Sequence, residues 1–426
     1  SNDFTSQNSD DRRATEKPLA FGYSGEYIST NELYSVLYGE FLATYINKLT
    51  DKLELTVRGG YNATNSSFNL TSRSTDGGLS SENFFDVAAS VNKANSDTRR
   101  QNRIIDALVG VVNLDYDNFA YLEGTIRRDR TSTMHPDNNS FLYPSINSSL
   151  VFSQKWTMPS FLDYGKLRAS WGIVGNYPGI YDAPISYSQG TLGSQVNGGS
   201  SVLYTELPWS FGNDKIAPER KYEYEIGLET RLFKNKIGLD ITHYNAQIRN
   251  QILRTTLAAT TGAGEILANT GTLRNKGIEV GLNSTPIKTS NFSWDLSVNY
   301  AWNRNKVEKL TDNSNEILHA DYDGNAAQLK SIVGQPMGDL FAHGIATDAS
   351  GNYIVQSDGL YKLDANWKKI GNTQPVGVGG IFNTFTFKGF SLNAAIDYRL
   401  GGYVMPTGVN WMTSRGLTEE SIKYMD

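Results

Sequence analysis

The feature that most constrains the fold of this chain is a strict alternation of apolar and polar side chains over long stretches. In residues 292–302, FSWDLSVNYAW, the residues between the apolar positions are small or polar. The apolar positions are Phe292, Trp294, Leu296, Val298, Tyr300 and Trp302. A period of two residues is typical of a β-strand with one apolar and one polar face. This strand has aromatic residues at both ends and aliphatic residues in the middle, so its apolar face needs an explanation.

The same alternation recurs along the chain and predicts about a dozen strands, with no convincing helix longer than a turn or two. The clearest strands come in pairs joined by tight turns, which indicates antiparallel hairpins. The expected turns are Thr50–Asp51, Asp117–Asn118, Lys234–Asn235 and Lys388–Gly389. We therefore predict an all-β fold.

Long polar connections alternate with these tight turns. They cover residues 62–103, 176–220, 251–272 and 308–375. Long loops are uncommon in compact soluble domains, whereas an up-and-down transmembrane barrel has short turns at one rim and long loops at the other. The sequence thus favours an antiparallel transmembrane β-barrel over a soluble sandwich or propeller, which remains the alternative. Strands of a sandwich are usually shorter, and no internal repeat indicates a propeller.

A barrel accounts for both faces of the strands. Leu296 and Val298 are expected to face lipid tails, with the aromatic residues on either side at the two membrane interfaces. On other strands, the opposite face carries charged residues that suit a water-filled lumen, because burying them without water is costly. These are Glu223, Glu225, Glu229 and Arg231 on one strand, and Glu123, Thr125, Arg127 and Asp129 on another. His243 is expected at the interfacial end of a lipid-facing row.

Composition excludes several classes of protein. Mean hydropathy is -0.42 and no run approaches the roughly 18 apolar residues of a spanning helix, so a helical membrane protein is excluded. The formal charge is -5 and no polybasic run occurs, which argues against nucleic-acid binding. Cysteine is absent, so disulfides and thiolate metal sites are excluded.

Catalytic and metal-binding motifs are also missing. The patterns G-x-S-x-G, H-E-x-x-H and G-x-x-x-x-G-K-[ST] do not occur, so we expect no enzyme and no cofactor. His135, His243, His319 and His343 are scattered without ligand spacing and are expected to be structural. Residues 321–325 and 348–352 faintly resemble calcium loops but lack the terminal glutamate, and ordinary turns explain them better.

Substrate-binding residues are expected in the long loops. The 176–220 connection carries aromatic rings among glycines and serines, and such rings can stack on sugars or clamp peptides. The candidates are Tyr177, Tyr181, Tyr187, Trp209 and Phe211. The alternative is that these rings pack the loop against its neighbours. Arg127 and Asp129, next to Arg128 and Arg130, predict a polar mouth, although ion pairs between strands explain them equally well.

Several segments resemble one family closely. They include YGKLRASWGIVGN, YEYEIGLETRLFKNKIGLDITHYN and NTGTLRNKGIEVGLNSTPIKTSNFSWDLSVNYAWNRNKV. From about Leu33 to Gly402 the chain is similar to the barrel of SusC/RagA-type TonB-dependent outer-membrane transporters of Bacteroidetes. The most specific match is 269–282, NTGTLRNKGIEVGL, where the matching residues are Gly271, Asn275, Lys276, Gly277 and Glu279.

The resemblance implies a barrel of roughly 22 strands around a plug, of which residues 1–426 would be the middle and C-terminal part. Neither a plug nor an aromatic-ended closing strand is recognisable in the chain, and Pro218-Glu219 replaces the Trp-Glu pair of relatives. It also implies import of oligosaccharides, or less readily peptides, across the outer membrane. The implied partners are a SusD-like surface lipoprotein, the TonB-ExbB-ExbD energising complex and outer-membrane lipid. A non-transporting adhesive barrel and a soluble carbohydrate-binding protein remain alternatives.

Overall fold

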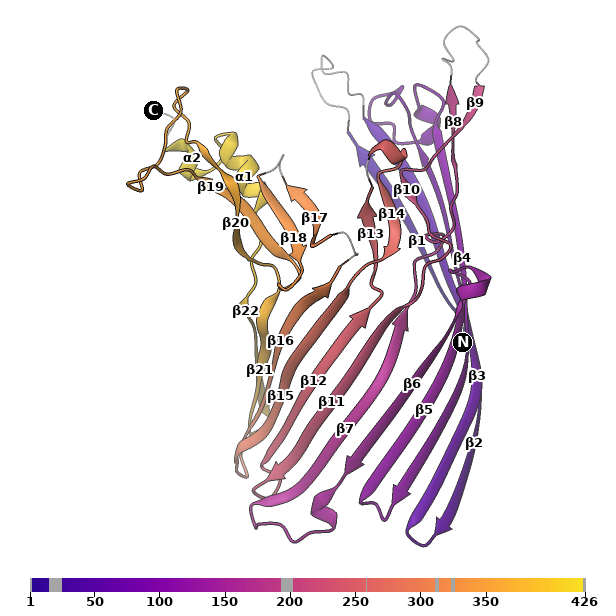
Figure 1. Ribbon diagram of the computed structural model, residues 1–426, viewed down its shortest axis with the longest axis vertical. Helices are drawn as coiled ribbons and strands as arrows, with labels where there is room; N and C mark the ends of the chain where they lie inside the picture. The colour runs from indigo at the N-terminus through magenta and orange to yellow at the C-terminus, as the bar shows by residue number, and fades with distance from the viewer. Residues whose placement is uncertain are drawn as a thin grey trace.

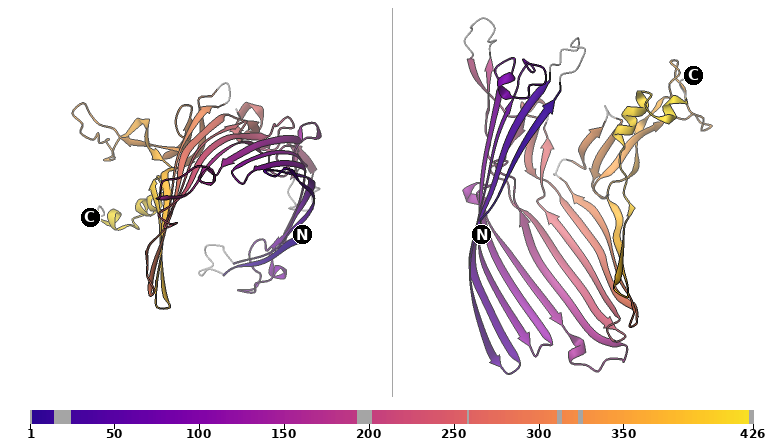
Figure 2. Two further views of the ribbon diagram at one scale, coloured as in Figure 1. Left: turned by 90° about the horizontal axis from the view of Figure 1, so that it is seen from below. Right: turned by 180° about the vertical axis from the view of Figure 1, so that it is seen from behind.

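One large curved antiparallel sheet of 13 strands dominates the computed structural model (Figure 1). The structure describes residues 2–14, 25–192, 202–257, 259–310, 314–322 and 326–423. In spatial order the strands are β1 (Asn2–Arg13), β2 (Glu26–Thr50), β3 (Leu53–Ser74), β4 (Asn95–Tyr116), β5 (Ala120–Thr131), β6 (Ser140–Leu150), β7 (Leu162–Asn176), β11 (Glu219–Leu232), β12 (Ile237–Arg249), β15 (Thr272–Lys288), β16 (Phe292–Lys309), β21 (Pro375–Phe387) and β22 (Phe390–Gly401). The sheet bends into an open arc with a concave and a convex face, and β1 and β22 form its two edges (Figure 2).

Tight turns join the strands at one rim, as predicted. Asp117 and Asn118 both have positive φ, 56° and 52°, and so do Lys234 and Asn235, at 61° and 60°. Left-handed backbone at the centre of a hairpin loop matches the twist of the flanking strands. The Lys155 ammonium donates to Asp117 at 2.8 Å, and this hydrogen bond lowers the pKa of the Asp117 carboxyl. All four predicted hairpins are confirmed.

The cross-strand register separates apolar from polar side chains, as the alternation predicted. Val298 lies between its cross-strand partners Leu282 and Ile381. A second row across the strands consists of Ile226, His243, Ile278 and Trp302. Apolar side chains of this convex face are strongly exposed. Examples are Ile126 at 50%, Trp171 at 42%, Ile226 at 52% and Ile396 at 57%. We call this surface the apolar belt; its exposure indicates contact with lipid rather than with water.

The opposite rim carries further small sheets in the long connections. These are the hairpin β8 (Ser188–Leu192) with β9 (Val202–Glu206), the sheet of β10 (Ser210–Phe211), β14 (Glu265–Asn269) and β13 (Ile252–Thr256), and the sheet of β17 (Glu316–Tyr322), β18 (Ala327–Ile332), β19 (Asp339–Ile345) and β20 (Leu363–Asn372). The helical segments are η2 (Val87–Ala89), η3 (Pro136–Asn138), η4 (Phe152–Gln154), η5 (Ala259–Thr261), α1 (Thr407–Ser414) and α2 (Glu419–Ile422). None of the helices in the described part of the chain is long and apolar enough to span a membrane.

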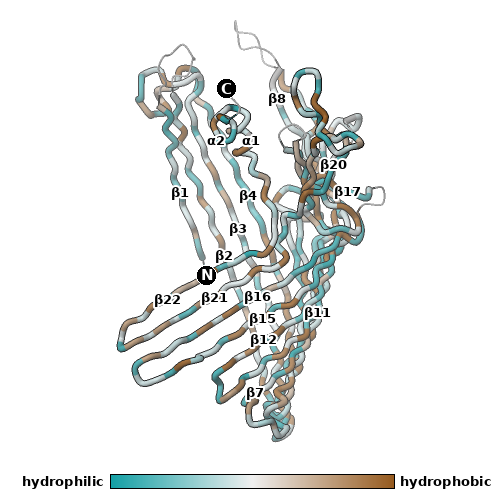
Figure 3. Tube along the Cα trace, turned by 90° about the vertical axis from the view of Figure 1, so that its left-hand side faces the viewer, coloured by the Kyte–Doolittle hydropathy of each residue, from teal (hydrophilic) through white to brown (hydrophobic). Residues whose placement is uncertain are grey.

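One of the four long connections is shorter than the sequence indicated, and the other three contain short strands that were not predicted. The predicted connection 62–103 shrinks to residues 75–94, because β3 and β4 continue far beyond the apolar belt. The strand β1 was not predicted at all. These segments are rich in Ser, Thr, Asn, Asp and Arg on both faces, so they lack the apolar alternation on which the prediction relied. Figure 3 shows their hydrophilic colour in β1 to β4.

A small apolar core attaches the β17–β20 sheet to the barrel wall. It contains Leu273, Val307 and Leu310, against which Ile317 and Met337 pack. The Met337 N–H also donates to Asn305 Oδ1 at 2.6 Å. The connection 308–375 is thus held on the rim by β15 and β16.

Candidate functional site

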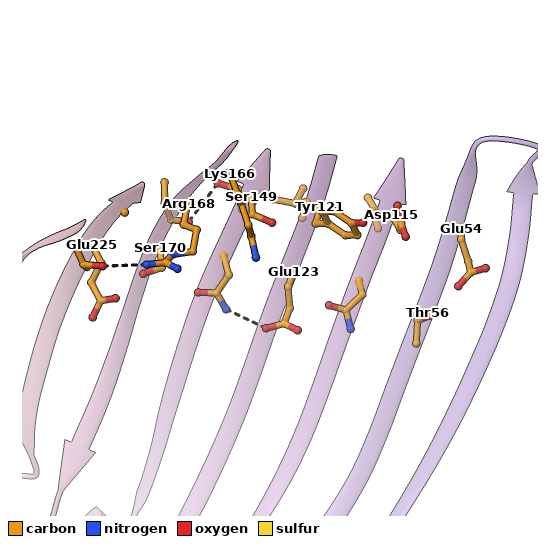
Figure 4. A pocket seen from close by; sticks show the side chains of 18 of the residues that line it. Glu54, Thr56, Asp115, Tyr121, Glu123, Ser149, Lys166, Arg168, Ser170 and Glu225 are labelled. Atoms are coloured by element: carbon orange, nitrogen blue, oxygen red, sulfur yellow. Dashed lines mark hydrogen bonds between the residues drawn. The ribbon is translucent and has the colours of Figure 1, made fainter. Parts of the chain in front are cut away.

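A polar hollow of about 610 Å³ lies on the concave face of the sheet, near the rim with the tight turns (Figure 4). Side chains from β3, β4, β5, β6, β7, β11 and β12 line it. Its charged lining residues are Glu54, Arg58, Asp115, Glu123, Lys166, Arg168 and Glu225. Asn147 donates to Glu123 at 3.0 Å, and Tyr121 adds one aromatic ring. The lining therefore offers both hydrogen-bond donors and acceptors to a polar molecule.

Arg168, in the lining of the hollow, takes part in an ion pair that bridges three strands. Arg168 on β7 donates to both oxygens of Asp240 on β12, at 2.8 and 2.7 Å, and to Thr242 Oγ1 at 3.0 Å. Gly227 of β11 lies between them; a Cβ there would be only 2.8 Å from Arg168 Nη2. Because Gly227 has no side chain, the guanidinium can cross β11 and bind Asp240 in a bidentate manner.

This ion pair is expected to couple β7 to β12 only moderately. The Arg168 and Asp240 side chains are 34% and 41% exposed, so water screens the pair and the coupling energy should be about 1 kcal/mol. A double-mutant cycle of Arg168→Gln, Asp240→Asn and the double variant, read by urea unfolding of the protein in lipid, measures it. Additive effects of the two substitutions would show that the bridge does not hold the strands together.

A second hollow of about 600 Å³ continues the polar wall toward β15, β16 and β21. Its lining includes Asp240, the partner of Arg168 in the first hollow, together with Glu229, Arg231 and Asp295. Thr285 donates to Asp295 at 2.7 Å. The two hollows together make the concave face a charged and hydrogen-bonded surface across most of the sheet.

The predicted carboxylate row of β11 lies on this concave face, as the register requires. Glu223 forms an ion pair with Lys221, and Glu229 lies 3.7 Å from Arg168. These contacts join side chains along and between strands. They fit the interpretation of a hydrated wall, which the sequence favoured over an acid/base pair.

Among the predicted binding residues, Tyr177 is packed rather than open. Its ring stacks on Phe141 with centroids 6.4 Å apart, and both belong to an apolar cluster with Met134 and Ile216. Burial raises the pKa of the Tyr177 phenol, and the charge of Asp129 adds to this. Tyr177 therefore fits the packing alternative.

The other four aromatic candidates lie apart from one another. Tyr181, Tyr187 and Trp209 are 60%, 63% and 77% exposed. Phe211 is half-buried in β10, where it pairs with Ile266 of β14. No ring contact joins these four side chains to one another in the part of the chain that the structure describes. They remain candidates for first contact with a substrate, and they do not form one preassembled site.

The predicted polar mouth is divided between two faces of β5. Asp129 is buried and accepts a hydrogen bond from Arg127 Nε at 2.5 Å. Arg130 points to the other face and binds both oxygens of Asp106 on β4, at 3.0 and 3.2 Å, while Arg128 donates to Ser140 at 2.9 Å. For Arg128 and Arg130, partners on neighbouring strands thus explain the charges.

The calcium-like segment 348–352 forms a turn that its own aspartate closes. Asp348 accepts the N–H groups of Ser350 and Asn352 at 2.8 and 2.9 Å, and the bond from Asn352 lowers the pKa of the Asp348 carboxyl. Residues 323–325 of the other segment lie outside the described residues. In the described ranges, no three His, Asp or Glu side chains are arranged to hold a metal ion.

Comparison with known proteins identifies the class. The family model "TonB dependent receptor-like, beta-barrel" matches residues 1–414, and the chain belongs to this family. Its members are outer-membrane transporters and receptors rather than enzymes. The apolar belt accordingly faces outer-membrane lipid, the tight turns lie on the periplasmic side and the long loops on the extracellular side.

The individual relatives include a SusC protein, in agreement with the resemblance found in the sequence. The chain is 26% identical to TonB-dependent receptor P3 of Formosa agariphila over 70% of this chain and 32% of the relative. It is 25% identical to TonB-dependent receptor SusC of Bacteroides thetaiotaomicron, over 66% and 29%. The fold matches a solved structure of the RagAB peptide transporter with a TM-score of 0.79 at 18% identity, over 94% of this chain and 45% of that one. The chain spans about a third of the length of these curated relatives.

Proposed function

We propose that the whole protein imports nutrient oligomers, foremost oligosaccharides, through this barrel in a TonB-dependent manner. The observation that carries the proposal is the pairing of an apolar convex face with a charged, hydrogen-bonded concave face. Carboxylate, amide and hydroxyl groups in the hollow, such as Glu123, Asn147 and Ser149, suit the hydroxyl groups of sugars. Peptides are the second candidate class, because the same groups can bind peptide amides.

Residues 1–426 are, in this proposal, the middle and C-terminal part of a larger barrel. The part of β2 that β1 does not cover and the outer edge of β22 have backbone groups without strand partners in the described residues, and such groups cannot face lipid. Further strands of a longer chain would pair with both edges, and a plug would occupy the lumen. The greater length of the relatives supports this arrangement.

The proposed partners follow from the same relatives. A SusD-like lipoprotein would cover the extracellular mouth, and the TonB-ExbB-ExbD complex would energise transport from the periplasmic side. The family description and the SusC relative support both partners.

Uptake by the native host tests the proposal. Cells that lack the full-length protein should lose energy-dependent uptake of one class in a panel of labelled oligosaccharides and peptides, and the wild-type gene should restore it. A protonophore should abolish the restored uptake. Unchanged uptake of every compound in the deletion strain would instead favour a structural or adhesive barrel.

Two loop substitutions should separate binding from packing. Trp209→Ala removes an exposed ring and should weaken capture of a ring-stacking substrate about fivefold, since one such contact contributes about 1 kcal/mol, with little change in stability. Tyr177→Ala removes a packed ring and should lower the free energy of unfolding by about 2 kcal/mol. Equilibrium binding and denaturant unfolding of both variants measure the difference. Equal destabilisation by both would show that Trp209 is also a packing residue.

A further inference from the structure

Basic side chains gather on the convex face immediately beyond the apolar belt, on the extracellular side of β11, β12, β15 and β16. The last row of the belt runs through Ile226, His243, Ile278 and Trp302. The same face turns basic two and four residues further along β15 and β16, and six residues further along β11 and β12. We call this surface the basic band; its cations are Arg220, Arg249, Arg274, Lys276, Arg304 and Lys306.

The register brings these cations side by side across neighbouring strands. Lys276 of β15 pairs with Arg304 of β16, and Arg274 pairs with Lys306 in the next row. Arg220 of β11 lies opposite Arg249 of β12. Adjacent strands are about 4.8 Å apart, so these charges repel one another. An anionic ligand would relieve that repulsion.

A hydrogen-bond network holds part of the band in place. The Arg249 guanidinium lies over the Tyr222 ring, 4.7 Å from its centroid, and donates to Gln247 at 2.7 Å. Glu308 accepts from Arg274 and from Gln247. Arg274 thus pairs with Glu308, and the other cations of the band give this surface a net positive charge.

Three cations of the band are exposed to a ligand. They are Lys276, Arg304 and Lys306. In the described ranges no ion pair within 4 Å joins any of them to a carboxylate, and Glu308, whose charge Lys306 also feels, is held by Arg274. Arg304 lies over the Trp302 ring, 5.6 Å from its centroid, so the guanidinium is directly above an aromatic residue of the belt. Two residues of strand span about 7 Å. The open cations therefore lie within one or two side-chain lengths of the edge of the belt.

We propose that the basic band binds the phosphate groups of an anionic lipid in the outer leaflet. The band is continuous with the lipid-facing belt, so a lipid can place its acyl chains on Ile278 and Trp302 while its phosphates meet Lys276, Arg304 and Lys306. Lysine and arginine near a membrane surface attract anionic headgroups in this manner. The inference rests on the proposed barrel, because it requires that the convex face contact the bilayer.

Native mass spectrometry of the full-length protein in detergent, titrated with diphosphoryl lipid A, tests the inference. The variant Lys276→Gln/Arg304→Gln/Lys306→Gln should bind this lipid roughly 100-fold more weakly than wild type, since each cation contributes about fivefold. A matched variant at the periplasmic rim, Lys234→Gln/Lys236→Gln/Lys388→Gln, should keep wild-type affinity. Wild-type affinity should also fall when the lipid A is dephosphorylated and when salt is raised.

The outcomes separate this inference from the barrel itself. Equal affinity of wild type and the band variant, or equal binding of dephosphorylated lipid A, would overturn the basic band as a phosphate site. An equal loss of lipid A affinity in the periplasmic variant would show that the phosphates do not bind specifically at the basic band. If wild-type protein migrates identically on SDS gels with and without boiling, the barrel itself is wrong. If its migration changes on boiling but the basic-band variant binds lipid A as tightly as wild type, only this inference is wrong.

Discussion

Leu296→Arg is expected to lower the free energy of unfolding of the full-length barrel by about 2 to 4 kcal/mol. Leu296 lies between Ser284 and Asn383 in the middle of the β16 segment that ends in aromatic residues on both sides. An arginine there would place its charge among lipid tails near the middle of the bilayer. Ser297→Arg is the matched control, because strand alternation places its side chain on the opposite, wet concave face.

Unfolding in lipid vesicles by guanidinium chloride measures both variants. Ser297→Arg should stay within about 1 kcal/mol of wild type, because its guanidinium stays hydrated. If the two positions tolerate arginine equally, the assignment of the convex face to lipid is wrong. A soluble fold would give that result.

Gly277→Ala is expected to destabilise the barrel strongly for so small a change, with a loss of about 3 kcal/mol in the free energy of unfolding. A Cβ at this position would overlap the backbone oxygen of Trp302 on β16 and would lie 2.5 Å from Tyr244 Oη. The tyrosine can move, but the strand backbone cannot move without breaking the β15–β16 ladder. The substitution should therefore reduce the yield of folded barrel.

Gly281→Ala on the same strand and face provides the control. The one heavy atom within 4 Å of a Cβ at this position would be Asp240 Cβ, at 3.9 Å. Replacing this glycine should leave the free energy of unfolding unchanged or raise it by up to about 0.5 kcal/mol, because alanine restricts the unfolded chain. Heat-modifiability on SDS gels and unfolding in lipid compare the two variants. Similar behaviour of both would show that the close approach at Gly277 is not needed for folding.

The sequence predicted those parts of the fold in which one face meets lipid and the other meets water. The four hairpins and the lipid-facing row of β16 follow from this contrast. It disappears in β1 and in the distal halves of β3 and β4, where water reaches both faces, and strand prediction fails there. The four-stranded sheet of 316–372 was missed for a related reason, since its strands are short and end in glycine-rich or polar turns.

For the candidate site, the sequence predicted only which residues lie on the concave face of the sheet, and not which of them are in contact. Alternation placed Glu225 on the concave side correctly, but nothing in the sequence links Arg168 with Asp240, 72 residues away. The one available signal was Gly227, a glycine inside an otherwise regular strand, which can indicate a close approach. The loop aromatics show the same limit, because exposure separates Trp209 from Tyr177 and only the tertiary structure determines it.

The length of β2, β3 and β4 has a consequence for how a solute reaches the lumen. At about 3.3 Å per residue, a strand of 25 residues is roughly 80 Å long, and with a tilt of about 40° it rises roughly 60 Å, against an apolar band of about 25 Å. By this estimate, more than half of this wall stands in water beyond the bilayer. The entrance on this side is therefore raised above the membrane surface, clear of the layer of lipid headgroups, and a large oligomer can reach it without first penetrating that layer.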